Sequence, residues 1–212
     1  MLLSEREYAH AADILAGHTE KEPLLKELGG WFKDTFGMEV YDYFCGFTNA
    51  GRIRLKLVLW DGASRRKMMK GANPDFRKQE RIGRKFSELC RKYQIHEEYC
   101  GAADMLVCYD TLQDEIGKRI LQRASARIKA VEARDVGRVE ILFSSVHVFF
   151  ETEKQREWHM QDGLCEEIER QISSIVKEYD SLGAFPDGIQ CVFTSLQTLN
   201  EKYKGSMFYY TR

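Results

Sequence analysis

The sequence predicts an α+β protein made of two copies of one αββαβ unit, each with an antiparallel sheet covered by helices. Three observations lead to this prediction: a short motif occurs twice, a helical face recurs, and two strand pairs recur. We expect one globular body over residues 1–212. Its parts are an N-terminal helix in 1–18, a first half in 19–110, and a second half with a C-terminal strand in 111–212.

The repeated motif follows a stretch with strand character in each half. It reads Thr111-Leu-Gln-Asp114 and, 87 positions later, Thr198-Leu-Asn-Glu201. A threonine followed three residues later by an acidic residue is typical of a helix N-cap box. The acidic groups Asp114, Glu115 and Glu201 could instead form a paired catalytic site, but capping explains these residue types without any chemistry.

The other two recurrences concern the elements upstream of the motif. One helical face repeats at an offset of 86, and the strand pairs repeat at offsets of 93 and 96, as shortened loops would require. The matching helical positions are Ile82, Phe86, Leu89, Cys90 and Tyr93, then Ile168, Ile172, Ile175, Val176 and Tyr179.

The first half begins with two helices and a hairpin. Ser4-x-x-Glu7 predicts a helix through Leu15, and Thr19-x-x-Glu22 predicts another that Gly29-Gly30 should kink. Strands follow over 40–47 and 53–60, and the second alternates apolar residues with Arg52, Arg54 and Lys56, which should face solvent.

The rest of the first half is a loop, a helix and a strand. Residues 61–73 are the longest irregular stretch, and Asn73-Pro74 should cap a helix that runs to Tyr93. A strand over 104–109 and a long helix over 111–131 lead into the second half.

The second half should contain strands over 138–143, 146–151 and 189–196, a helix closing near Ser181, a short helix from Thr198 and a final strand over 206–211. With the strand at Met105 this half has the ferredoxin-like order βαββαβ. The first half lacks a leading strand, which 189–196 or 207–210 could supply by exchange; a single mixed sheet without exchange is the alternative.

Composition sets broad limits. The six cysteines have no C-x-x-C spacing, so we interpret them as reduced core residues and expect no metal; His96 and Cys100 lie four apart without a second pair. We find no signal-peptide pattern and no membrane-spanning window, so the expected location is cytoplasmic. The histidines form no recognisable catalytic constellation and no glycine-rich phosphate loop is present, which favours a non-enzyme without cofactors.

Charge is the feature most informative about function. Residues 52–92 carry 14 basic and 4 acidic side chains, a net of +10, in a chain whose net charge is −1. The candidate anion- or partner-binding residues are Arg52, Arg54, Lys56, Arg65, Arg66, Lys67, Lys70, Arg77, Lys78, Arg81, Arg84 and Lys85.

The leading hypothesis is a non-catalytic protein that binds an acidic macromolecular partner through this basic surface. Nucleic-acid binding is the alternative, although only Trp60 and Phe76 are aromatic residues among the bases. A further alternative is an enzyme or small-ligand binder with a pocket between the halves. The basic charge could also be balanced within the chain, for example by Glu166, Glu167 and Glu169.

Overall fold

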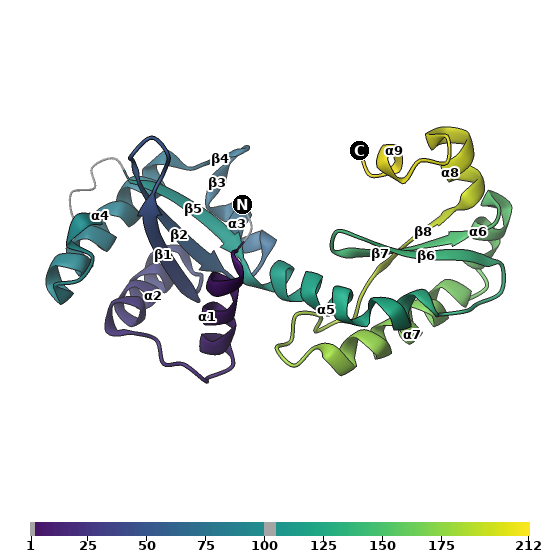
Figure 1. Cartoon of the computed structure of the whole chain (residues 1–212), viewed down its shortest axis with the longest axis horizontal. Helices are drawn as coiled ribbons and strands as arrows, with labels where there is room; N and C mark the ends of the chain where they lie inside the picture. Colours follow the sequence, from purple (N-terminus) through teal and green to yellow (C-terminus); the bar gives the residue numbers. More distant parts are fainter. Residues whose placement is uncertain (1–2, 100–104) are drawn as a thin grey trace. The chain divides into compact units, whose positions relative to one another are not determined.

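A computed structural model describes residues 3–99 and 105–212 (Figure 1). The chain is of mixed α+β structure, as predicted, and divides into two compact units, Met1–Glu115 and Ile116–Arg212. The division lies inside the helix α5 (Leu112–Lys129). The expectation of one globular body stays a prediction.

Unit 1 contains a mixed three-stranded sheet of order β1-β2-β5, in which β1 and β2 are antiparallel and β2 and β5 are parallel. A short antiparallel ribbon, β3 with β4, is separate from that sheet. The elements are α1 (Glu5–Leu15), α2 (Pro23–Phe36), β1 (Asp42–Phe47), β2 (Ile53–Leu59), α3 (Gly62–Lys67), β3 (Met69–Lys70), β4 (Asn73–Pro74), α4 (Phe76–Tyr93), the 3-10 helix η1 (Glu97–Tyr99) and β5 (Leu106–Thr111).

One face of this sheet is apolar and packs against α2 and α4. Every second residue of β2 points to that face, as the alternation of the strand requires. The core there includes Leu24, Leu25, Leu28 and Phe32 of α2, Ile82, Phe86, Leu89 and Cys90 of α4, and Leu55, Leu57, Leu59, Val107 and Tyr109 of the sheet.

The opposite face packs against α1 through buried charge. The Lys56 side chain is only 4 % exposed, and its Nζ lies 2.9 Å from Glu7 Oε2 and 3.4 Å from Asp110 Oδ2. On the same face His10 Nδ1 lies 2.6 Å from Asp42 Oδ2. The prediction that Lys56 faces solvent was therefore wrong, because α1 covers the face to which the charged positions of this central strand point.

Unit 2 contains a second mixed sheet, of order β6-β7-β8, with β6 and β7 antiparallel and β7 and β8 parallel. Helix α5 packs on α7 through an ion pair between Arg127 and Glu178. Besides α5, the elements are β6 (Val136–Leu142), β7 (Ser145–Phe150), α6 (Glu153–His159), α7 (Leu164–Tyr179), β8 (Cys191–Ser195), α8 (Leu196–Tyr203) and α9 (Met207–Tyr210).

The strand predictions need three corrections. The sheets are mixed and not antiparallel, because the third strand of each returns parallel to the second after a helical crossover. Within the described residues each of these sheets has three strands, so the four-stranded ferredoxin-like order is not confirmed, and β8 pairs with β7 and not with the first half. The expected C-terminal strand is the helix α9, whose Tyr210 packs on His147 and Phe149 of β7.

Several predicted helix boundaries also change. The capping box at Ser4 is confirmed, and α2 continues through its two glycines. The expected loop over 61–73 contains α3 and β3, and Asp75, not Asn73, caps α4. Ser195 caps α8, so Thr198 lies inside that helix; the helix starts three residues earlier because the Ser195 hydroxyl accepts the Thr198 amide at 2.9 Å.

The buried ion group gives a stability prediction. Lys56→Met removes the cation and leaves the carboxylates of Glu7 and Asp110 without it, which should lower the free energy of unfolding by about 3–5 kcal/mol. Lys129→Met is the matched control, because Lys129 is 45 % exposed beside Glu140 and should cost at most about 1 kcal/mol. Urea unfolding at pH 7 measures both, and equal losses would contradict the burial of Lys56.

The same group predicts a dependence of stability on pH. Burial acts to raise the pKa of Glu7, but hydrogen bonds from the Ser4 amide and from Lys56 outweigh it and hold the pKa below its ordinary value of 4.5. A lowered carboxyl pKa stabilises the fold above pH 4.5, and this stabilisation is lost as the pH falls through the lower folded value. Melting temperatures should therefore fall more steeply below pH 4.5 for the wild type than for Glu7→Gln; parallel curves would be the contrary result.

Candidate functional site

The structure separates the predicted basic residues into two groups. The first group is engaged within unit 1: besides Lys56, Lys85 lies 2.8 Å from Glu88, Arg84 pairs with Glu80, and the Arg81 guanidinium lies 5.7 Å from the centre of the Phe36 ring. At the hairpin, Arg52 is exposed and Arg54 is half-buried, and both have interactions inside the protein. The predicted basic surface is therefore smaller than expected, because Arg84 and Lys85 of α4 pair with acidic side chains and Lys56 of β2 is buried.

The second group lies together along one short stretch of chain. We call residues 62–78, which comprise α3, the β3–β4 ribbon and the first turn of α4, the basic segment. The basic side chains of this segment are Arg65, Arg66, Lys67, Lys70, Arg77 and Lys78. Five of these six side chains are exposed, and Lys78 is half-buried.

Caps and one buried anchor hold the basic segment in place. Asp61 accepts the Ser64 amide at 2.7 Å and begins α3, and Asp75 accepts the Arg77 amide at 3.0 Å and begins α4. Met68 is fully buried in the core of unit 1. The hydrogen bond from the Ser64 amide, with the charges of Arg66 and Lys67, lowers the pKa of Asp61. The backbone is therefore held at these points while five of the basic side chains are exposed; the sixth, Lys78, donates to the Lys67 carbonyl.

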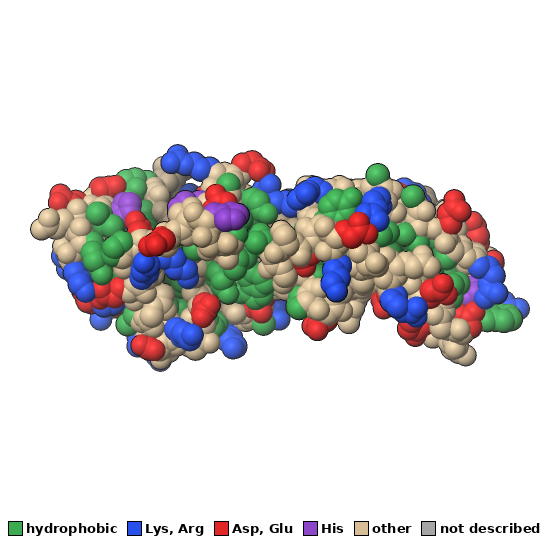
Figure 2. All heavy atoms as spheres, turned by 90° about the horizontal axis from the view of Figure 1, so that it is seen from below, with side chains coloured by type: hydrophobic (Ala, Val, Ile, Leu, Met, Phe, Trp, Pro, Cys, Tyr) green, Lys and Arg blue, Asp and Glu red, His purple; other side chains and the backbone are tan. Residues whose placement is uncertain are grey.

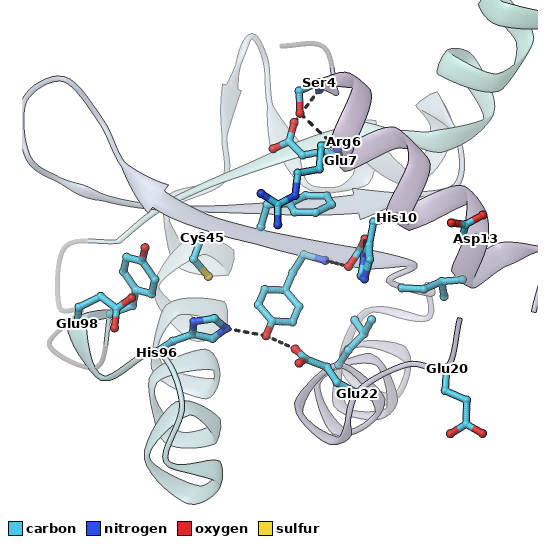
Figure 3. A pocket seen from close by; sticks show the side chains of 16 residues that line it. Ser4, Arg6, Glu7, His10, Asp13, Glu20, Glu22, Cys45, His96 and Glu98 are labelled. Carbon is cyan, nitrogen blue, oxygen red and sulfur yellow. Dashed lines mark hydrogen bonds and ion pairs between the residues drawn. The ribbon is translucent and has the colours of Figure 1, made fainter. Parts of the chain in front are cut away.

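A pocket of about 830 Å³ lies elsewhere on unit 1, between α1, β1 and residues 96–99 (Figure 3). Two polar networks line it. Tyr43 Oη donates to Glu22 and lies 3.1 Å from His96 Nε2, and His10 pairs with Asp42. Figure 2 shows histidine and acidic side chains close together on the face of unit 1 that it draws.

Burial shifts the pKa of three groups on β1 that line this pocket. Burial and the neighbouring Glu22 raise the pKa of Tyr43, and burial raises the pKa of the Cys45 thiol. Burial also raises the pKa of Asp42, against the opposing effect of His10. A thiol whose pKa is raised is a poor nucleophile at neutral pH, so the pocket favours binding over covalent chemistry.

A smaller pocket in unit 2, of about 210 Å³, surrounds His159. Its ring is stacked on Phe150, with Nε2 3.0 Å from Asp135 and Nδ1 2.8 Å from Asp162. Each ring nitrogen thus lies within hydrogen-bond distance of a carboxylate. This arrangement connects the C-terminal end of α6 to Asp135, just before β6, which is a structural role.

The acidic candidates of the repeated motif are engaged locally. Asp114 accepts from the Thr111 hydroxyl, Glu201 accepts from Gln197 at 2.9 Å, and Glu115 is buried. In the part of the chain that the structure describes, no cluster of three or more His, Cys, Asp or Glu is arranged to hold a metal ion.

Sequence reasoning missed the pocket beside β1. Its paired residues are far apart in the chain: His10 and Asp42 are separated by 32 positions, and Tyr43 and His96 by 53. The one available signal is the placement of Glu7 and His10 three positions apart, which puts them on one face of α1.

The fold and these sites define an α+β protein with two small mixed sheets, a basic segment and a polar pocket. Comparison with protein-family models, curated proteins and solved structures finds no match to this chain. Among residues 3–99 and 105–212, none of the helices is both long and apolar enough to cross a bilayer.

The cysteine environments predict slow alkylation. Burial raises the pKa of Cys45, Cys108, Cys165 and Cys191, so iodoacetamide at pH 8 should label them much more slowly in the folded protein than in urea. Mass spectrometry of labelled peptides measures each rate, and the unfolded chain is the control. Equal labelling in both states would contradict the burial of these thiols.

Proposed function

We propose that this protein is non-catalytic and binds an acidic protein partner through the basic segment. The observation that supports this proposal is the display of five exposed cationic side chains, from Arg65 to Arg77, on a backbone fixed by caps and by Met68. Cations held in a defined arrangement raise both the association rate and the selectivity for an acidic surface.

The local charge balance supports the same proposal. Residues 61–78 contain six basic side chains and two acidic ones, Asp61 and Asp75. Both carboxylates are occupied with helix amides at the N-termini of α3 and α4. Among the described residues, no ion pair joins a basic side chain of the segment to Asp61 or Asp75, whereas Arg84 and Lys85 of α4 do have acidic partners.

The distribution of aromatic residues favours a protein partner over nucleic acid. Phe76 is 76 % exposed within the basic segment, whereas Trp60 packs on Tyr41 with ring centres 5.6 Å apart. Single-stranded nucleic acid is usually bound on several stacking aromatics. One exposed ring beside the cations suits the centre of a protein interface, where aromatic and arginine residues are enriched.

We also propose that the two units descend from one duplicated αββαβ unit, and that the protein is cytoplasmic. The duplication is supported by the matching strand order and strand directions in the two sheets. A homologue that contains one such unit would be direct support. Homologues whose two halves share no pattern would count against it.

Charge reversal tests the binding proposal. The triple variant Arg65→Glu, Arg66→Glu, Lys67→Glu should bind fluorescent polyglutamate at least about tenfold more weakly than the wild type in low salt. The matched control Lys154→Glu, Lys177→Glu, Lys202→Glu changes the net charge equally at exposed positions of unit 2 and should lose no more than about threefold.

Two results would contradict the proposal. One is an equal loss for both triple variants, which would indicate an effect of net charge alone. The other is tighter binding of RNA or DNA than of polyglutamate. In that case the slope of log affinity against log salt concentration should be smaller by about two to three in the Arg65, Arg66, Lys67 variant than in the wild type. That second result would assign the basic segment to nucleic acid.

A further inference from the structure

The strand β1 is an edge strand of the sheet of unit 1, and in the part of the chain that the structure describes a side chain caps only one of its outward amides. In the sheet of unit 1, β1 and β5 are the edge strands, and in that of unit 2 the edges are β6 and β8. An unprotected edge offers backbone hydrogen bonds to any extended chain, so proteins usually block it with charges, proline, bulges or side-chain caps.

Each of the other three edges has one side-chain cap or one bulge near one end. The Val107 amide of β5 donates to Gln79 at 2.9 Å, and the Cys191 amide of β8 donates to Glu169 at 2.8 Å. The strand β6 is interrupted by a register shift between Val136 and Arg138, and Arg138 is exposed on it.

Among the described residues, the edge of β1 has one side-chain cap, at Tyr43, and it differs from the other edges in the acidic pocket beside it. The Tyr43 amide donates to the side chain of Asp42 at 2.8 Å. The remaining residues, Phe44-Cys45-Gly46-Phe47, include no charged residue and no proline.

The hydrogen-bond alternation shows which backbone groups point outward. The Thr48 amide donates to the Arg52 carbonyl at 2.8 Å, and bonded and non-bonded pairs alternate along an antiparallel pair. Gly46 and Phe44 are then bonded to β2, so Cys45 and Phe47 direct their N–H and C=O groups away from the sheet.

The polar pocket lies beside this edge and determines the charge of what can approach it. Its walls come from α1, from the start of α2 and from residues 96–99 (Figure 3). Six carboxylates line it, against Arg6 and two histidines. Those of Glu7, Asp42 and Glu22 already have partners, while Asp13, Glu20 and Glu98 are exposed. Only weak or long contacts engage the first two: Asp13 lies 3.8 Å from His18, and Glu20 lies 3.4 Å from Lys26.

We infer that the edge of β1 accepts an extended peptide with lysine or arginine side chains as a fourth strand of the sheet of unit 1. The outward groups of Cys45 and Phe47 would pair with the peptide backbone. The exposed carboxylates of Asp13, Glu20 and Glu98 would select basic side chains. This site is independent of the basic segment, which has the opposite charge.

The experiment compares two synthetic octapeptides of alternating lysine and threonine, one unmodified and one N-methylated at every second residue. Both carry the same charge, but the methylated peptide cannot form one of its two ladders of hydrogen bonds. Fluorescence anisotropy with the 212-residue chain should show that the unmodified peptide binds at least about tenfold more tightly than the methylated one.

Two substitutions at one position provide a matched pair. Phe47→Pro removes an outward N–H without breaking the ladder to β2, and should weaken binding of the unmodified peptide about tenfold. Phe47→Ala removes the same ring and keeps the N–H, so it should stay within about threefold of the wild type. Thermal unfolding shows whether each variant is folded.

A charge variant keeps the test decisive if Phe47→Pro does not fold. Glu20→Lys with Glu98→Lys, both at exposed positions, should weaken binding about tenfold or more. Equal binding of the two peptides, or tight binding of a glutamate–threonine peptide, would overturn the inference. A wild-type dimer that Phe47→Pro converts to monomer would also overturn it, because a second copy of the chain would then occupy the edge.

Discussion

The buried ammonium group of Lys56 is the constraint on which the arrangement of unit 1 depends. It lies on the central strand, where both faces of the sheet are covered, and a buried charge is tolerated only with close partners. Glu7 supplies one partner, so the first helix must lie across that face at a fixed position. The position of α1 in turn places His10 against Asp42 and forms one wall of the pocket beside β1.

The two units cover the second face of similar sheets in different ways. Unit 1 uses the charged contacts of α1, whereas unit 2 places Tyr210 of α9 on Phe149 and within 2.8 Å of His147. The units also differ after the antiparallel strand pair. In unit 2 a single short helix, α6, precedes α7, while in unit 1 the β3–β4 ribbon is added between α3 and α4. This addition carries part of the basic segment, so the proposed binding surface lies where unit 1 departs from the pattern of unit 2.

Net charge along the chain is an incomplete guide to surface charge. The segment over 52–92 has a net charge of +10, yet Lys56 is buried, and Arg84 and Lys85 have acidic neighbours. On the face drawn in Figure 2, basic and acidic side chains are interspersed. The basic segment is accordingly a smaller cationic surface than the charge count indicated. The pocket beside β1 is lined mainly by acidic side chains and so has the opposite charge. Two surfaces of opposite charge on one unit can select two different partners.

The sequence by itself determined the mixed α+β class, the capping box at Ser4, and the approximate positions of most helices and strands, because these depend on local periodicity and on residues within a turn of one another. Only the tertiary structure decided that Lys56 is buried, that residues 207–210 form a helix, and that His10, Asp42, Tyr43 and His96 line one pocket. A strand that alternates between apolar and basic residues has the same pattern whether its second face contacts water or a helix. Which of the two applies is set by the distant α1, and contacts between residues 32 to 53 positions apart leave no local pattern in the sequence.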